Sequence, residues 1–319
     1  MARLLVLMAE RLRESDPMGA RLLNWPGDPS PMGDVLGLRL AGGLHGLVLR
    51  GEAPGLSAVY PPHETTDDAL WEAVLTAFAE HAGPLEKALQ SPPQTNEVRR
   101  SAALLPGLGV IARMFGLPMM LSEVGASAGL NLGLDRFRLE TKQFGFGAEN
   151  PVLTLRPEWS GGTPDMEEIE ISGRQGCDLL PIDLSSKSEQ ARLLSYIWPD
   201  QPERLALTRA AIEAAHHEVV GEHAINFLTR RLAEPCERHV QVIMHSIAWQ
   251  YLSAEDRAEG DAIIAAARRG ATRSAPVARL AMEADGSSEG AALTLQTWPG
   301  GEWQELARVD FHGRWVRWE

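Results

Sequence analysis

The stretch Pro118-Met-Met-Leu-Ser-Glu-Val-Gly-Ala-Ser-Ala-Gly-Leu-Asn131 decides how this chain is interpreted. It contains a short apolar run, an acid at Glu123, a loop of small residues and the start of a further element. Small residues let backbone N–H groups approach a ligand closely, and the start of a following helix carries partial positive charge. We therefore expect a strand over 119–124, a helix over 127–135 and a nucleotide-sized ligand on the loop between them.

The composition is that of a globular protein with a large core. The chain has 319 residues, 44% of them hydrophobic, and its net charge of −13 argues against nucleic acid as a partner. We expect a small-molecule or protein substrate instead. The only cysteines, Cys177 and Cys236, argue against a disulfide framework and favour a reducing cytoplasm. Glu10 interrupts the apolar run 4–8, so we expect no signal peptide and no membrane span.

Two kinds of pattern divide the chain. Helical periodicity dominates the first part, where Thr95 is a possible N-cap for a helix that reaches Phe115. Later, β-like and helical segments alternate, as they do in a parallel sheet flanked by helices. We expect a helical cap or substrate domain over 1–116 and a Rossmann-like cofactor domain over 117–319, with an insertion at about 137–168.

Further strands are expected after the first, and helices separate them. The predicted strands are 168–178, 218–222, 240–246 and 277–282. A hairpin-like pair over 291–296 and 304–311 follows them. The helix after the fourth strand should open with the capping pair Ser253 and Asp256.

This layout resembles that of class I methyltransferases that use S-adenosylmethionine, in which the last strand inserts antiparallel. Glu123-Val-Gly-Ala-Ser-Ala-Gly129 is similar to the first cofactor motif of that family, where an acid ends the strand and a glycine-rich turn contacts the amino-acid part of the cofactor. The resemblance implies an α/β, Rossmann-like sheet that is mostly parallel and ends in an antiparallel hairpin. It also implies that S-adenosylmethionine is bound by Glu123, Gly125, Ala126, Ser127, Gly129, Asn131, Asp178, Glu222 and His223.

The same resemblance gives roles to residues at the strand ends. Asp178 falls where the family places an acid for the ribose hydroxyls, and an ionised carboxylate offers only acceptors. Glu222 resembles the acid near the adenine. The catalytic candidates lie at or just after the end of the fourth strand, where the methyl group would face the substrate: His245, Ser246 and Tyr251. His245 is the candidate base because neutral imidazole titrates near working pH.

Three departures from the methyltransferase pattern stand out. Alanine occupies the loop position where a middle glycine is common, and the insertion before Asp178 is long. The fourth strand is not followed by an Asn-Pro-Pro-Tyr motif. The assignment to this class therefore depends on the layout and on the first motif.

Over almost its full length, the chain is identified as a member of a bacterial family known as domain of unknown function 2332. The residues behind this identification are Gln94-Thr-Asn-Glu97, Glu123 to Asn131, Gly176-Cys-Asp178, Ile197-Trp-Pro-Asp-Gln201, and His245-Ser246 with Trp249-Gln-Tyr251. Membership implies no particular reaction, but it directs attention to the polar segment before residue 98. We expect this segment to cap the cofactor or substrate cleft through Gln94, Thr95, Asn96 and Glu97, and Trp249 to shape the acceptor pocket.

A hydrolase is the alternative function. Gly125-Ala-Ser-Ala-Gly129 also reads as the G-x-S-x-G elbow of α/β-hydrolases, with Ser127 as nucleophile. Asp183 or Asp261 could then be the acid and His312 the base. An ionised Glu123 beside a developing oxyanion argues against this chemistry, as does the lack of a His-Gly-Gly-Gly segment upstream.

A third possibility is a module that binds S-adenosylmethionine and acts through partners without catalysis. Binding without turnover would indicate it. A metal site is not expected, because no carboxylate cluster of recognised spacing accompanies His216, His217 and His223.

Overall fold

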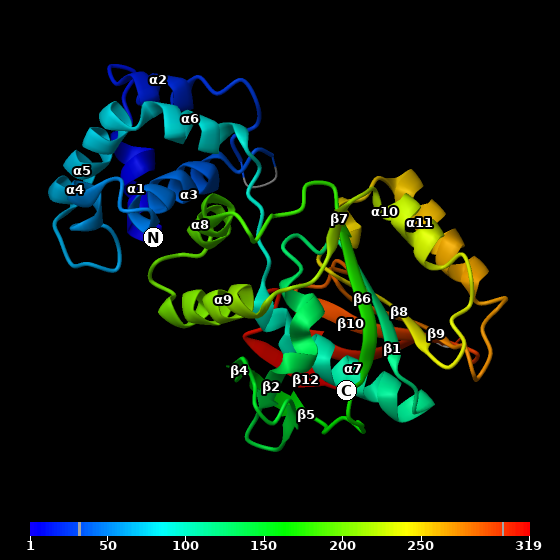
Figure 1. Cartoon of the computed structure of the whole chain (residues 1–319). Helices are drawn as coiled ribbons and strands as arrows, with labels where there is room; N and C mark the ends of the chain where they lie inside the picture. Colours follow the sequence, from blue (N-terminus) through cyan, green and yellow to red (C-terminus); the bar gives the residue numbers. More distant parts are fainter. Residues whose placement is uncertain (31–32, 302) are drawn as a thin grey trace. The chain divides into compact units, whose positions relative to one another are not determined.

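The computed structural model describes residues 1–30, 33–301 and 303–319, which form two compact units (Figure 1). The helical unit consists of residues 1–95 and 183–206, and the sheet unit of residues 96–182 and 207–319. Each is described by itself below.

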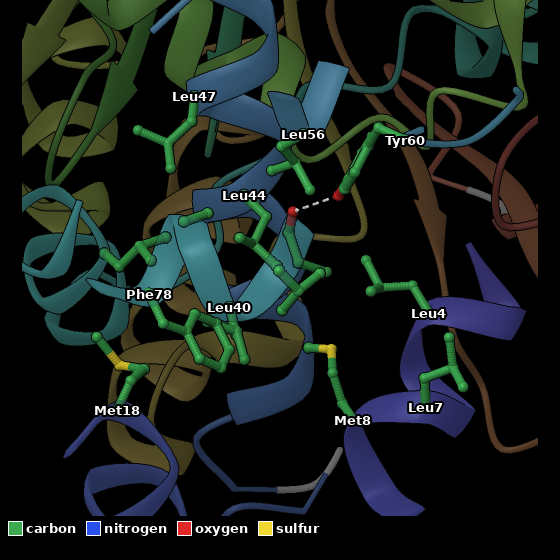
Figure 2. Close-up of a cluster of buried hydrophobic side chains, with 14 of the residues drawn as sticks. Leu4, Leu7, Met8, Met18, Leu40, Leu44, Leu47, Leu56, Tyr60 and Phe78 are labelled. Carbon is green, nitrogen blue, oxygen red and sulfur yellow. Dashed lines mark hydrogen bonds between the residues drawn. The ribbon is translucent and has the colours of Figure 1, made fainter. Parts of the chain in front are cut away.

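The helical unit is built from short amphipathic helices around one apolar core. They are α1 (Ala2–Arg11), α2 (Pro17–Leu23), α3 (Leu36–Leu49), α4 (Pro54–Ser57), α5 (Asp67–Glu80), α6 (Ala82–Gln90) and α8 (Lys187–Ser195). Figure 2 shows part of the core, with Leu4, Leu7, Met8, Met18, Leu40, Leu44, Leu47, Leu56, Tyr60 and Phe78 labelled. The buried hydroxyl of Tyr60 donates to the Ala41 carbonyl at 3.2 Å, so its polar atom is satisfied within the apolar cluster.

The segment 183–206 belongs to the helical unit because α8 and the turn after it pack on α3. A Cβ atom on Gly42 would lie 2.6 Å from the Tyr196 ring, so α3 needs glycine at this contact. The chain then enters α9 (Pro202–Ala214), which continues into the sheet unit. The expected boundary after residue 116 therefore differs from the structural division, which separates Thr95 from Asn96 and assigns 183–206 to the helices.

The sheet unit is a mixed α/β structure with a large, mostly parallel sheet in the order β5-β12-β11-β10-β9-β8-β1-β6-β7. Its strands are β1 (Met119–Val124), β5 (Glu158–Gly161), β6 (Ile171–Asp178), β7 (Val219–Gly221), β8 (Val240–Ser246), β9 (Val277–Glu283), β10 (Ala291–Trp298), β11 (Trp303–Val309) and β12 (Trp315–Trp318). The predicted bounds of β1 and β8 are confirmed. The neighbouring strands β7, β6, β1, β8 and β9 run parallel to one another. Because β1 lies between β6 and β8, the strand order reverses at β1.

Helices cover both faces of this sheet. On one face lies α7 (Ser101–Phe115), where a Cβ on Gly107 would lie 2.8 Å from the side chain of Leu280. On the other face, α10 (Ala224–Arg231) and α11 (Ala254–Ala267) pack beside each other. Val124, Ile243 and Val277 are buried in one cluster with side chains of these two helices. As predicted, Ser253 caps α11 by accepting the Asp256 N–H at 3.0 Å.

The C-terminal strands depart from the predicted methyltransferase layout. β10 pairs antiparallel with β9, β11 with β10, and β12 with β11. The expected hairpin is therefore present, but the expectation that the last strand inserts into the sheet is wrong, because each strand adds next to the one before it.

The inserted segment after residue 136 forms strands rather than an irregular loop. A small sheet contains β2 (Phe137–Glu140), β3 (Gly145–Gly147) and β4 (Leu153–Leu155) in the order β3-β2-β4. β5 pairs with β12 of the large sheet, and Trp159 stacks on Trp318 with ring centroids 5.8 Å apart. No helix among the described residues is both long and apolar enough to cross a membrane.

Two local predictions around the first motif were wrong. The helix expected over 127–135 is a short 3-10 helix, η2 (Leu130–Arg136), because the chain turns through left-handed backbone at Ser127 and Gly129 before helical bonds begin. Thr95 does not cap a helix that reaches Phe115. Glu97 begins η1 (Val98–Arg100) by accepting the Arg99 N–H, and α7 follows.

Candidate functional site

The candidate site lies at the edge where the parallel strands end, called the carboxyl edge here. β1, β6, β8 and β9 end there, at Val124, Asp178, Ser246 and Glu283. β11 runs in the same direction as β9, so its end at Val309 reaches the same edge. In open α/β sheets, ligands bind outside the carboxyl ends of strands, at the point where the strand order reverses.

The loop between β1 and η2 has a tightly specified backbone. Gly125, Ser127 and Gly129 have φ values of 70°, 54° and 71°, in the region that favours glycine. A Cβ on Gly125 would lie 2.5 Å from the Cβ of Ala248, which follows β8. The loop therefore needs glycine both for its conformation and for its contact with the segment after β8.

Most N–H groups of this loop already have protein acceptors. Ala126 donates to the Cys177 carbonyl at 2.9 Å, and Ser127 donates to Asp178 Oδ2 at 2.9 Å. Gly129 donates to the Ala126 carbonyl at 2.7 Å. The sequence predicted that such groups would face a ligand at the start of a helix. The structure gives instead a short 3-10 helix and a loop that donates two of these bonds to β6 and one to itself.

Glu123 is a buried acid beside this loop. Its exposed fraction is 2%, and its Oε2 atom has no hydrogen-bond partner among the described residues. Burial raises the pKa of Glu123 to about 8. The positive charge of Arg100 lowers this pKa, and repulsion from Asp178 raises it, but burial has the largest effect. The carboxyl group is therefore mostly protonated at neutral pH, with a vacant acceptor that a positively charged donor could occupy.

Asp178 is bound to the backbone at both oxygens. Oδ2 accepts the Ser127 N–H and Oδ1 accepts the Leu180 N–H at 3.0 Å. A carboxylate has further lone pairs, so a diol could still donate to it. Its predicted contact with a ribose stays a prediction.

The other predicted cofactor residues have structural partners as well. Glu222 forms an ion pair with Arg230, with Oε2 2.7 Å from the guanidinium. His223 caps α10 by accepting the Ile225 N–H at 3.4 Å. Asn131 is buried, and its amide oxygen accepts the Ser101 hydroxyl at 2.8 Å. These contacts hold the site together, and the ligand contacts expected of these residues stay predictions.

The predicted capping segment is divided between the two units. Gln94 and Thr95 belong to the helical unit, where Gln94 accepts a bond from Arg192 at 3.3 Å. Asn96 and Glu97 belong to the sheet unit. Asn96 Oδ1 accepts the N–H of Leu130, the first residue of η2, at 2.9 Å. Asn96 thus caps the element that follows the glycine loop.

Both ring nitrogens of His245 have a hydrogen-bond partner. Its Nδ1 is 2.7 Å from Glu283 Oε1, and its Nε2 accepts from Arg279 Nε at 3.0 Å. Arginine only donates, so Nε2 must be the unprotonated nitrogen and Nδ1–H donates to Glu283. Burial lowers the pKa of His245, which keeps the ring neutral. Trp249 stacks on the imidazole at 4.8 Å, and Arg279 lies over the Trp249 ring.

Glu283 extends this cluster to the backbone after β8. Its Oε1 also accepts the N–H groups of Ala248 and Trp249, each at 3.1 Å. Burial alone would raise the pKa of Glu283, but the His245 hydrogen bond and these amides outweigh it and lower the pKa. Glu283 therefore fixes the position of Ala248, which contacts Gly125. Both ring nitrogens of His245 are used in this arrangement, so its proposed action as a base has no support from the geometry.

The two other catalytic candidates differ in exposure. Ser246 is buried, and its carbonyl accepts from Arg100 Nη1 at 3.0 Å. Tyr251 is 76% exposed, in the 3-10 helix η3 (Trp249–Tyr251). A catalytic role for either remains a prediction.

Sequence reasoning missed three residues of this site. Arg100 bridges the carbonyls of Ser246 and Phe311, and Arg279 and Glu283 enclose His245. A charged residue in or just after an apolar strand was the available signal for Arg279 and Glu283. Arg100 gave no signal, because it resembles an ordinary solvated residue before a helix.

Three of the residues considered for a hydrolase, Ser127, Asp261 and His312, lie in the sheet unit. The Ser127 hydroxyl is buried and has no hydrogen-bond partner in the described part of the chain. Asp261 binds Arg279 at 2.7 Å, and Asp183 accepts the Ser185 N–H at 2.8 Å. His312 lies 3.4 Å from Glu97. Within residues 1–30, 33–301 and 303–319, no group of His, Cys, Asp and Glu has an arrangement suited to a metal ion.

The fold and site define a mixed α/β protein with a buried acid, a tight glycine loop and a reversal of strand order at one edge. The chain belongs to the bacterial family described as "Uncharacterized protein conserved in bacteria (DUF2332)", which matches residues 1–318. No curated protein matches the sequence.

Proposed function

We propose that this protein is a methyltransferase that binds S-adenosylmethionine at the carboxyl edge of the large sheet. The observation that carries the proposal is the chemistry of the loop after β1. Its amides are largely occupied, and the carboxyl groups of Glu123 and Asp178 lie beside it. Such a surface suits a ligand that donates hydrogen bonds or carries positive charge.

This chemistry favours S-adenosylmethionine over a dinucleotide. The sulfonium and ammonium groups of the cofactor are cations, and its ribose offers two donors. A pyrophosphate needs free N–H groups, but Asp178 already occupies the Ser127 N–H where an anion would bind. The acids therefore disfavour a phosphate ligand and favour a cationic nucleoside.

The reaction would be an in-line attack on the sulfonium methyl group. A bond forms between an acceptor atom and the methyl carbon while the carbon–sulfur bond breaks, and its electron pair stays on sulfur. Positioning of the reactants can supply roughly 7–11 kcal/mol of such a barrier. The rigid contact between Gly125 and Ala248 suits this requirement, because it fixes two segments of the carboxyl edge.

Calorimetric titration with S-adenosylhomocysteine tests the proposal. We expect micromolar binding by the native protein and a loss of at least tenfold in an Asp178→Asn variant, which keeps an acceptor for the backbone but removes the charge. An Asp165→Asn variant is the matched control, because Asp165 is an exposed acid that pairs with Arg113 at the surface. Circular dichroism should show that all three proteins are folded.

Two outcomes would overturn the proposal. One is the absence of binding at millimolar S-adenosylhomocysteine. The other is tighter binding of NAD than of S-adenosylhomocysteine, since a pyrophosphate ligand contradicts the charge argument. Binding without any turnover of S-adenosylmethionine would instead indicate the non-catalytic module.

A further inference from the structure

His312 lies at the carboxyl edge in a rigid loop after β11. Asp310 Oδ1 accepts the N–H groups of His312 at 3.0 Å and Arg314 at 3.2 Å. The Arg314 guanidinium binds both oxygens of Asp310, at 2.9 and 2.7 Å. Although burial opposes it, these hydrogen bonds lower the pKa of Asp310 to about 2, so the carboxylate stays ionised. The loop is therefore held in one conformation.

This loop is joined to the rest of the candidate site. Gly313 has a φ of 69°, and a Cβ atom there would overlap the Arg99 carbonyl. Arg100 donates to the Phe311 carbonyl through Nε and to the Ser246 carbonyl through Nη1, each at 3.0 Å. Phe311, the residue before His312, is thus connected through Arg100 to Ser246 at the end of β8.

Behind His312 lies a buried acid. The Glu97 side chain is 1% exposed and the His312 side chain is 50% exposed, with Glu97 Oε2 3.4 Å from His312 Nδ1. Glu97 Oε1 accepts the Arg99 N–H at 3.2 Å, which fixes the carboxyl group. The Glu97 carbonyl lies 3.5 Å from the side-chain nitrogen of Asn131, next to the glycine loop. Contacts of this length in a site without its ligand can tighten when a substrate binds.

We propose that Glu97 and His312 form a general-base pair that removes the proton from the methyl acceptor. In the proposed pair, Glu97 Oε2 accepts Nδ1–H, which leaves the lone pair of the imidazole on Nε2. As the acceptor oxygen or nitrogen bonds to the methyl carbon, its proton passes to Nε2 and sulfur keeps the electron pair of the broken bond. The acceptor is therefore a hydroxyl or amine compound whose nucleophilic atom carries a proton.

This inference builds on the proposed methyl transfer, but the contact between Glu97 and His312 can be tested without cofactor or acceptor. The arrangement matches the general requirement that a base be oriented by a third group. It also assigns the base to an exposed imidazole, whereas His245 is enclosed by Glu283 and Arg279.

The first test is the tautomer of His312, read by nitrogen NMR of protein labelled at its histidines. A His312→Asn spectrum assigns the signal. We expect a protonated Nδ1 and an unprotonated Nε2 in the native protein, and a shift of that population towards Nε2–H in Glu97→Gln. A native protein with predominantly Nε2–H would overturn the proposal, and this result needs no variant that could fail to fold.

The second test is the acylation of histidines by diethyl pyrocarbonate, followed by peptide mass mapping. His312 should react several-fold faster than His216, an exposed histidine in the same protein, and Glu97→Gln should remove the difference. Equal rates in the native protein would contradict an activated Nε2. Neither readout uses S-adenosylhomocysteine, so failure of the calorimetric titration and failure of this pair are distinguishable.

Discussion

Glu123 and His245 project from opposite faces of the sheet, although they lie near the ends of neighbouring strands. Val124 is in register with His245, so Glu123 aligns with Met244 and, one strand further, with Leu280. Leu280 faces α7, whereas Val124 packs beneath α10 and α11. The predicted cofactor acid and the predicted base therefore titrate in separate environments, and each can be probed alone.

The stability of the protein should fall as pH rises through the range in which Glu123 stays protonated. Its pKa is about 8 in the folded protein and 4.5 ordinarily, so unfolding releases a proton between these values. Each pH unit in this window should cost the free energy of unfolding up to about 1.4 kcal/mol. Urea unfolding of the native protein and of Glu123→Gln at pH 5 to 8 measures the difference. A constant difference between the two proteins would show that Glu123 ionises normally.

Binding of a ligand that places its ammonium group near Glu123 should release a proton from this acid. A positive charge near Oε2 favours the ionised carboxylate, so the pKa of Glu123 should fall when the ligand binds. The affinity for S-adenosylhomocysteine should then increase with pH up to about 8, by as much as roughly tenfold per unit. Calorimetry at pH 7 in two buffers of different ionisation enthalpy measures the proton release. Ligand binding by the Glu123→Gln variant should release fewer protons than binding by the native protein. Equal proton release by the two proteins would mean that another group loses the proton.

Removal of the Glu283 carboxyl group should destabilise the segment after β8. Glu283→Ala leaves the N–H groups of Ala248 and Trp249 and the Nδ1–H of His245 without an acceptor. An unsatisfied buried donor costs about 1–3 kcal/mol, so we expect a loss of at least about 3 kcal/mol in unfolding free energy. Glu283→Gln retains an oxygen at this position and should lose less than half as much. Equal losses in denaturant titrations of the two variants would argue against the role of this acceptor.

The contact between Gly125 and Ala248 can be separated from the backbone strain at Gly125. Gly125→Ala should be destabilising, both because its φ is 70° and because its Cβ would lie 2.5 Å from that of Ala248. Ala248→Gly removes the clash but leaves the strain, which is about 1 kcal/mol or more. The double variant should therefore recover part of the lost stability. Strict additivity of the two changes in thermal unfolding would mean that the segments do not touch.

The central strands could be predicted from the sequence because the physical signal is local. Buried parallel strands are short apolar runs between breakers, and the runs at 119–124 and 240–246 fit this description without ambiguity. The cap of α11 is equally local, since Ser253 and Asp256 are neighbours in the chain. The pairing of β12 with β5 could not be predicted, because it joins two short segments that are distant in sequence.

The sequence could indicate some residues of the candidate site but not the contacts between them. Small residues indicated the loop, yet its internal hydrogen bonds depend on Asp178 and on the Cys177 carbonyl from another strand. A histidine at a strand end resembles a base in sequence. Only the positions of Glu283 and Arg279 reveal that both nitrogens of His245 are occupied.

The pairing of β5 with β12 also bears on how the chain is synthesised. β5 (Glu158–Gly161) leaves the ribosome long before its partner β12 (Trp315–Trp318), because six other strands of the large sheet, β6 to β11, lie between them in the sequence. Until then, the backbone donors of β5 and the Trp159 face that stacks on Trp318 have no native partner. The large sheet is therefore expected to be completed only after translation of residues 315–318, and the inserted segment needs protection from premature association in the meantime.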